Sequence, residues 1–284
     1  AAPLLASLRP RFDIVPHRDY GLPYLSDAKE RLWIASSYSG NTEETIDFAR
    51  SAFRKGYAVA TVSIGGKLVE FAQAHKFPHI IMPDTKIQPR SALGFSLVAL
   101  AKLIGDEAFL QELRKLSRAL HPVELRGRGQ ALSKILANKV SVIYSSARNS
   151  AVAYNWKIKF NETGKIPALY NVFPELNHNE MTGFDVIPST KKLSRNFHFI
   201  FLTDSADHPK IQKRMQVCRE LYEGRGLPVT EVRLTGATAF EKMFSSLILA
   251  DWTALYLSKA YGTEAEKVPM VEEFKKLIIR TRTE

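Results

Sequence analysis

The chain has 284 residues, of which 45% are hydrophobic and 24% are charged, and its formal net charge is +11. This is the composition of a globular protein, and it excludes low-complexity and fibrous chains. Since no run of about 18 apolar residues occurs, the sequence predicts no transmembrane helix and no membrane partner. The basic residues are spread over both halves and no nucleic-acid-binding motif accompanies them, so we expect no nucleic-acid partner. Such a charge suits a protein that attracts small anions.

Two further features concern the compartment and the cofactors. The single cysteine, Cys218, cannot form a disulfide within the chain, and residues 1–12 lack the basic-then-apolar order of a signal peptide. Both features favour a cytoplasmic protein. No group of His, Glu or Cys residues has the spacing of metal ligands, so we expect neither a metal ion nor another cofactor.

Strands and helices alternate along the first part of the chain. Apolar and amphipathic runs predict strands at residues 31–37, 57–66 and 79–83, and helices at residues 41–56, 67–76 and 89–106. A polar and helical stretch, residues 107–139, follows and is interrupted at Pro122. We expect a domain boundary in this stretch, which divides the chain into domains 1–120 and 121–284.

The alternation then begins a second time. The same patterns predict strands at residues 140–146, 167–173, 197–204 and 229–234, helices at residues 149–165, 210–226, 239–262 and 271–282, and an irregular loop at residues 174–185. Strands separated by helices form parallel sheets with helices on both faces. The sequence therefore predicts an α/β protein with two similar halves.

One strand-to-helix junction is unusually rich in hydroxyl groups. Residues 36–45, "SSYSGNTEET", place Ser37, Ser39 and Thr42 before a predicted helix. A helix N-terminus offers free N–H groups and a partial positive charge, which bind phosphate, and the hydroxyls would add donors. Asn41 or Thr42 could instead merely cap the helix, but a cap needs one such residue. The junction lacks the lysine of a P-loop, which disfavours a nucleoside triphosphate.

The segment "SxSGNTEET" resembles the phosphate-binding segment of sugar isomerase (SIS) domains. On this segment alone, isomerases, glucosamine-6-phosphate-forming synthases and sugar-responsive regulators all remain open. The resemblance implies two SIS domains, each a three-layer αβα sandwich with a parallel sheet. It also implies that Ser37, Tyr38, Ser39 and Thr42 bind the phosphate of a sugar phosphate.

Three further segments narrow the resemblance. "PRSALGFSL" (89–97), "FNETGK" (160–165) and "ELNHNE" (175–180) follow in the order found in bifunctional phosphoglucose/phosphomannose isomerases. That family implies a metal-independent aldose–ketose isomerase of glycolysis and gluconeogenesis. It would interconvert glucose 6-phosphate, and also mannose 6-phosphate, with fructose 6-phosphate through a cis-enediol.

The same resemblance assigns four catalytic roles. Arg90 would steady the enediolate, Glu162 would move the proton between C2 and C1, and His178 would open the sugar ring. A lysine of the last helix would assist the histidine, and its spacing from a nearby proline favours Lys275 over Lys276. Without the resemblance, each of these residues is an ordinary surface or loop residue.

The local pattern around Glu162 fits a base. Ala151, Asn155, Ile158 and Glu162 share one face of the predicted helix, and Gly164 is typical of a helix stop. Glu162 should therefore lie in the last turn. The negative end of the helix dipole there disfavours its ionised form, which suits a group that must take up a proton.

The sequence departs from the family pattern at two places, and these affect what we expect of the start of the chain and of the activity on mannose 6-phosphate. The glycine-rich "GxGGS" turn that usually precedes the hydroxyl segment is not found, so we expect the natural protein to carry an upstream segment with "GGS" or a close variant. Val268 stands where relatives can carry threonine. Valine lacks the hydroxyl, so the resemblance implies glucose activity more directly than mannose activity.

The family resemblance also implies a homodimer in which the loop with His178 reaches the partner's site. A non-catalytic phosphosugar sensor and another SIS-domain sugar-phosphate isomerase are the alternatives. The presence of both Glu162 and His178 argues against a sensor.

Overall fold

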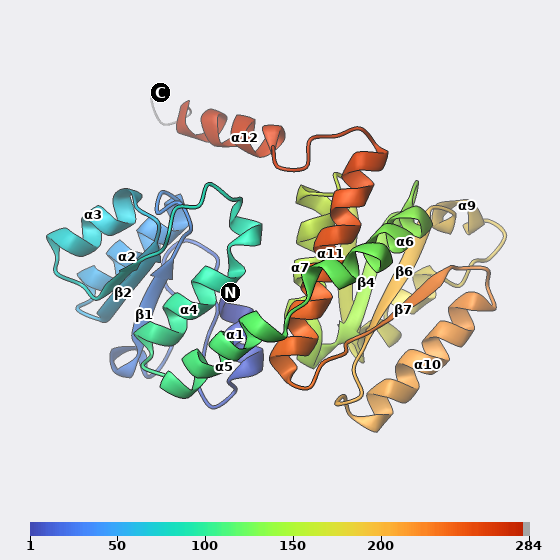
Figure 1. Ribbon diagram of the computed structural model, residues 1–284, viewed down its shortest axis with the longest axis horizontal. Coiled ribbons are helices and arrows are strands. Elements are labelled where there is room, and N and C mark those ends of the chain that lie inside the picture. The colour runs from blue at the N-terminus through green and yellow to red at the C-terminus, as the bar shows by residue number, and fades with distance from the viewer. Residues whose placement is uncertain (281–284) are drawn as a thin grey trace. The chain divides into compact units, whose positions relative to one another are not determined.

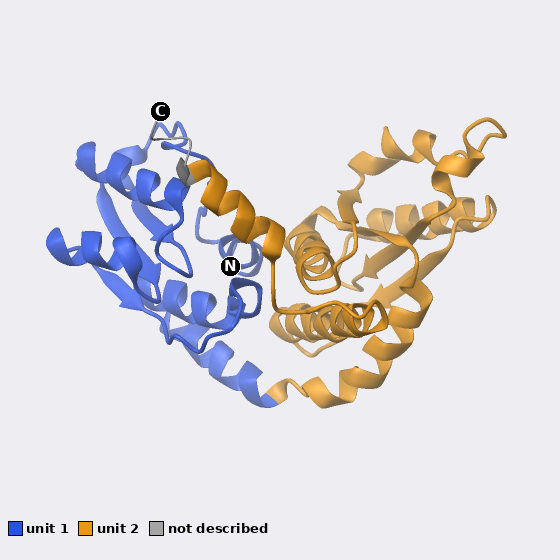
Figure 2. Cartoon of the chain, turned by 90° about the horizontal axis from the view of Figure 1, so that it is seen from above, with its two compact units in different colours: residues 1–118 blue, residues 119–284 orange. Residues whose placement is uncertain are grey.

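The computed structural model describes residues 1–280 and consists of two compact units. Figure 2 shows them as residues 1–118 and residues 119–284. Each unit carries its own parallel sheet.

The sheet of unit 1 has three parallel strands in the order β1-β2-β3, namely β1 (Leu32–Ser36), β2 (Ala58–Ser63) and β3 (His79–Ile81). Right-handed crossovers place the two connecting helices on one face of such a sheet. These helices are α2 (Glu43–Arg54) and α3 (Gly66–Ala74). The apolar side chains of β1 that point to this face pack against them, as in the cluster of Ala35, Ala49 and Leu68.

Three further helices complete unit 1: α1 (Ala2–Leu8), α4 (Leu93–Leu103) and α5 (Glu107–Ala119). α4 packs against β2, β3 and α1 on the face of the sheet opposite α2 and α3 (Figure 1). Short 3₁₀ turns lie at Ala28–Glu30 and Pro89–Ser91. Unit 1 is thus a three-layer αβα sandwich.

The sheet of unit 2 has four parallel strands in the order β5-β4-β6-β7. They are β4 (Val140–Ser146), β5 (Ala168–Phe173), β6 (Phe197–Thr203) and β7 (Val229–Arg233). The two central strands are buried over nearly their whole length, as expected for a sheet that is covered on both faces.

Helices cover both faces of this sheet (Figure 1). One face carries α6 (Arg126–Leu136), α7 (Ser150–Glu162) and α11 (Ala239–Ala260), with α11 packed against the other two. The other face carries α10 (Pro209–Glu223) over an aromatic core that includes Tyr144, Phe199 and Tyr222. The remaining helices are α8 (Glu180–Gly183), α9 (Lys191–Ser194) and α12 (Pro269–Arg280), with 3₁₀ turns at Pro122–Leu125, Ala147–Asn149 and Glu175–Asn177.

The double α/β alternation predicted from the sequence is confirmed, with local differences. The helix expected from residue 89 is divided into a 3₁₀ turn and α4, and the loop expected at 174–185 contains a 3₁₀ turn and α8. Residues 281–282 of the last predicted helix lie outside the described residues. No helix within residues 1–280 has the length and apolar character needed to cross a membrane.

Candidate active site

The hydroxyl loop, residues 36–42, connects the carboxyl end of β1 to the start of α2. The hydroxyl groups of Ser37 and Thr42 lie 2.8 Å apart, and the amide of Gly40 donates to Ser37 Oγ at 3.2 Å. Ser37 is buried, Thr42 is half-buried and Ser39 is exposed. Ser37 therefore orders the loop from inside, while the Ser39 hydroxyl faces solvent where a ligand can reach it.

The hydroxyl loop lies in close contact with the next strand-to-helix loop, which connects β2 to α3. Gly40 has φ +72°, and a Cβ atom there would lie 1.8 Å from the carbonyl oxygen of Gly65. A side chain at this position is thus excluded by the neighbouring backbone and by the left-handed conformation. The sequence does not indicate that Gly40 lies against the second loop, and only the structure reveals this contact.

Asn41 caps a different helix from the one that follows it. Its Oδ1 accepts a hydrogen bond from the amide of Lys67 at 3.1 Å, in the first turn of α3. Thr42 occupies the N-cap position of α2, yet its own side chain makes no capping hydrogen bond. The first amides of a helix need partners from outside it, and an anion is one partner that suits them.

A cavity of about 680 Å³ adjoins the hydroxyl loop within unit 1. β1 lines it along its whole length, together with His17, Tyr38 and Thr45 among others. Two of its polar atoms, His17 Nε2 and Tyr38 Oη, are buried and make no hydrogen bond with the described residues. Of the four residues expected to bind phosphate, only Tyr38 lines this cavity.

Arg90 belongs to the 3₁₀ turn Pro89–Ser91 and is only 7% exposed. The sequence alone suggested a solvated arginine in the first turn of a long helix. The break between the 3₁₀ turn and α4 instead buries it in unit 1. Burying an arginine is costly unless its charge is compensated, which distinguishes Arg90 from an ordinary surface residue.

Glu162 is the last residue of α7 and is half-buried. The expected position in the last turn is therefore the observed one. The residue with left-handed backbone is Lys165, with φ +58°, rather than Gly164. Gly164 serves a different purpose, because a Cβ there would lie 2.8 Å from the carbonyl oxygen of Phe160.

His178 is exposed and follows the 3₁₀ turn Glu175–Asn177. Its loop is anchored by Glu180, whose carboxylate accepts hydrogen bonds from Tyr144 on β4 and Asn171 on β5. Burial, above all, raises the pKa of the Tyr144 hydroxyl, so Tyr144 remains a donor to Glu180. Glu180 was not among the residues predicted from the sequence, although its place in "ELNHNE" was a signal.

Lys275 and Lys276 both lie on α12 and are exposed. Lys275 Nζ forms an ion pair with Glu272 at 2.8 Å, one turn earlier on the same helix. An exposed pair of this kind is weak and can exchange for another partner.

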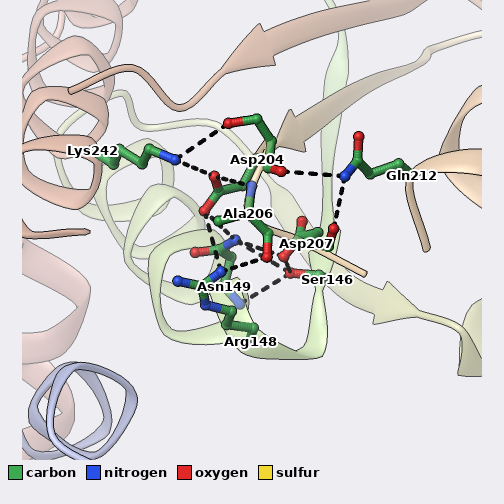
Figure 3. A network of polar contacts seen from close by, with 9 residues as sticks. Ser146, Arg148, Asn149, Asp204, Ala206, Asp207, Gln212 and Lys242 are labelled. Atoms are coloured by element: carbon green, nitrogen blue, oxygen red, sulfur yellow. Dashed lines mark hydrogen bonds and ion pairs between the residues drawn. The ribbon is translucent and has the colours of Figure 1, made fainter. Parts of the chain in front are cut away.

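Two buried aspartates, Asp204 and Asp207, lie at the carboxyl edge of the unit 2 sheet (Figure 3). Asp204 follows β6, and its carboxylate accepts from Lys242 Nζ at 2.6 Å. Asp207 accepts from Ser146 Oγ at 2.7 Å, and Asn149 Nδ2 lies 3.5 Å from Asp204 Oδ2 and 3.4 Å from Asp207 Oδ1. Both carboxylates are 5% exposed.

The charges of this network follow from its contacts. Burial raises the pKa of Asp204, but the hydrogen bond from Lys242 and other donors outweigh it, so the pKa lies below its usual value. Burial keeps the pKa of Asp207 above its usual value, although Ser146 opposes the shift. An edge that holds an ionised aspartate disfavours a phosphate.

These features define a class of protein: SIS-type αβα units with a hydroxyl loop at a sheet edge. A family model described as the bacterial phospho-glucose isomerase C-terminal SIS domain matches residues 126–278. In structure, the chain resembles a hypothetical protein from Thermus thermophilus, with a TM-score of 0.72 and 18% identity over 91% of this chain and 73% of that one. This likeness supports the fold.

Sequence comparison identifies the family. A bifunctional phosphoglucose/phosphomannose isomerase of Caldicellulosiruptor bescii is 34% identical over 280 residues, which cover 93% of this chain and 81% of the relative. One from Thermoplasma volcanium is 32% identical over 265 residues, which cover 92% and 81%. The chain belongs to the bifunctional phosphoglucose/phosphomannose isomerase family, as the sequence motifs indicated.

Proposed function

We propose that the protein is an aldose–ketose isomerase that interconverts glucose 6-phosphate, and also mannose 6-phosphate, with fructose 6-phosphate. Family membership supports this, since the relatives are named for both activities. Within each unit one observation supports it: in unit 1 the N-terminus of α2, where the Thr42 side chain makes no capping hydrogen bond, lies beside exposed Ser39, and in unit 2 Glu162 ends α7. The first suits a phosphate and the second a proton-transfer base.

The roles follow from chemistry. Ser39, Thr42 and the N-terminus of α2 hold the phosphate, which does not react. Glu162 removes the proton beside the carbonyl of the open-chain sugar and returns it to the neighbouring carbon. Arg90 stabilises the negative oxygen of the enediolate that forms between these steps.

Ring opening is a separate step, since the sugar must first expose its carbonyl. His178 is assigned to it, with Lys275 as its helper. A coupled assay of fructose 6-phosphate conversion, in the presence of EDTA, tests the proposed function. We expect turnover under these conditions. Tight binding of the sugar phosphate without turnover would instead identify a sensor.

The phosphate assignment predicts that Ser39→Ala and Thr42→Ala mainly raise KM. The phosphate is bound in both the ground and transition states, so kcat should change little. A hydrogen bond to a charged group contributes about 1.5–3 kcal/mol, so each KM should rise about tenfold or more. Ser117→Ala is the matched control, because Ser117 is an exposed hydroxyl on α5 of the same unit. An unchanged KM in both variants would refute the assignment.

We also propose a cytoplasmic homodimer in which the partner's copy of the His178 loop reaches the site. Large apolar side chains of α12 are exposed, namely Met270 at 81%, Phe274 at 60% and Leu277 at 53%, and such a patch is typical of an interaction surface. Light scattering at micromolar concentration should give twice the 32.0 kDa of the chain. Full activity in a demonstrably monomeric sample would contradict this assembly.

A further inference from the structure

Lys165 has an unusual position three residues beyond Glu162. It is half-buried and its backbone is left-handed, with φ +58°, a conformation that is unfavourable for a residue other than glycine. Such a conformation persists only where the surroundings hold it in place. The contacts of its ammonium group show what those surroundings are.

The ammonium group donates to backbone carbonyls of two segments that are far apart in sequence. One acceptor is the carbonyl oxygen of Glu162, at the end of α7. The others are the carbonyl oxygens of Lys267 and of Ala265, the latter at 3.5 Å. The last carbonyls of a helix have no partner within it, and a cation there is favoured by the helix dipole. Lys165 therefore caps the C-terminus of α7 and links a second segment to the end of this helix.

The second segment is the linker between α11 and α12, residues 261–268. Its first part is fixed to the end of α11, because the amide and hydroxyl of Thr263 both bond to Ser258. Its last part is held by Lys165 through Lys267, two residues before α12 begins. The described residues of α12 from 270 to 278 are all exposed, so burial does little to hold this helix within unit 2.

We propose that Lys165 is a positioning residue for the isomerase reaction. By joining the end of α7 to the linker, its ammonium group fixes the direction in which α12 continues from the linker. Lys275 lies six residues beyond Pro269, the first residue of α12, and so about 9 Å along a helix that rises about 1.5 Å per residue. Over that length a small rotation at the linker moves the amine by ångströms, and a misplacement of about 1 Å can cost about 10²-fold in rate. This inference rests on the proposed function.

The experiment compares Lys165→Met with Lys157→Met by amide hydrogen exchange and by kinetics. Lys157 lies on α7 as well, is also half-buried, and makes no hydrogen bond or ion pair with the described residues. We expect exchange of the amides in residues 262–272 to rise at least about tenfold in Lys165→Met alone, because opening of the linker no longer breaks these bonds. Its kcat should fall about 10- to 100-fold, with KM changed less than about threefold.

Two further variants keep the test decisive. Lys165→Gly removes the side chain but suits the left-handed backbone, so it should fold and show the same exchange and kinetic defects. In a Lys275→Met background, Lys165→Met should cost less than about twofold, because the group it positions is already absent. Unchanged exchange in both Lys165 variants would overturn the contact, and raised exchange with unchanged kcat would overturn its role in the reaction. Exchange needs no substrate, so an inactive wild-type protein would contradict the proposed function and leave the contact measurable.

Discussion

Glu162→Gln is expected to lower kcat by at least about 10³ while substrate binding is retained, because the amide cannot accept the proton that isomerisation removes. The substitution keeps the shape of the side chain, and α7 already ends at this residue, so the fold should be unaffected. Steady-state kinetics with fructose 6-phosphate, together with a direct binding measurement, gives kcat and affinity separately.

Glu223→Gln is the matched control for this substitution. Glu223 is an exposed glutamate that ends α10 as Glu162 ends α7, and it lies outside the proposed site. We expect it to retain wild-type kcat. If Glu162→Gln kept more than a tenth of wild-type kcat, another residue would be the base and the proposed site would be wrong.

His178→Ala should lower kcat by about 10²-fold with the natural, mostly cyclic substrate, since a positioned acid–base group contributes about 10²–10⁴-fold. The defect should be partly rescued by 5-deoxyfructose 6-phosphate, which lacks the hydroxyl that closes the ring. Glu162→Gln should not be rescued, because proton transfer still follows ring opening. The comparison separates the two steps by chemistry rather than by the size of the defect.

His121→Ala is the control for the histidine substitution, since His121 is exposed and lies in the segment before a 3₁₀ turn. Equal rescue of His178→Ala and Glu162→Gln by the open-chain substrate would contradict the division of roles. No rescue of either variant would remove His178 from the ring-opening step.

The sequence predicted the features that depend on local pattern. β1 and β6 are largely apolar runs, because helices cover both faces of each sheet. The position of Glu162 in the last turn of α7 followed from the nearby glycine and from the spacing of four residues on one face. The hydroxyl loop was recognisable because its polar side chains are concentrated at one strand-to-helix junction.

The features that the sequence missed depend on contacts between distant residues. Asn41 caps α3 rather than α2, and its partner Lys67 is 26 residues away. Lys165 contacts Lys267 across 102 residues, and Glu180 accepts from Tyr144 across 36. Neither pattern nor spacing specifies such pairs, since they arise only when the sheets and helices have assembled. The same holds for the burial of Arg90, which depends on a break between two helical segments.

Deuterium incorporation is the most direct test of proton transfer through an enediol with Glu162 as the base. Fructose 6-phosphate would be incubated with the wild-type protein in D₂O, and both sugars would be analysed by NMR and mass spectrometry. We expect deuterium at C2 of the glucose 6-phosphate formed and at C1 of the recovered fructose 6-phosphate, and none with Glu162→Gln. Conversion by the wild-type protein with no deuterium in either sugar would indicate direct hydrogen transfer between the two carbons and would contradict the account.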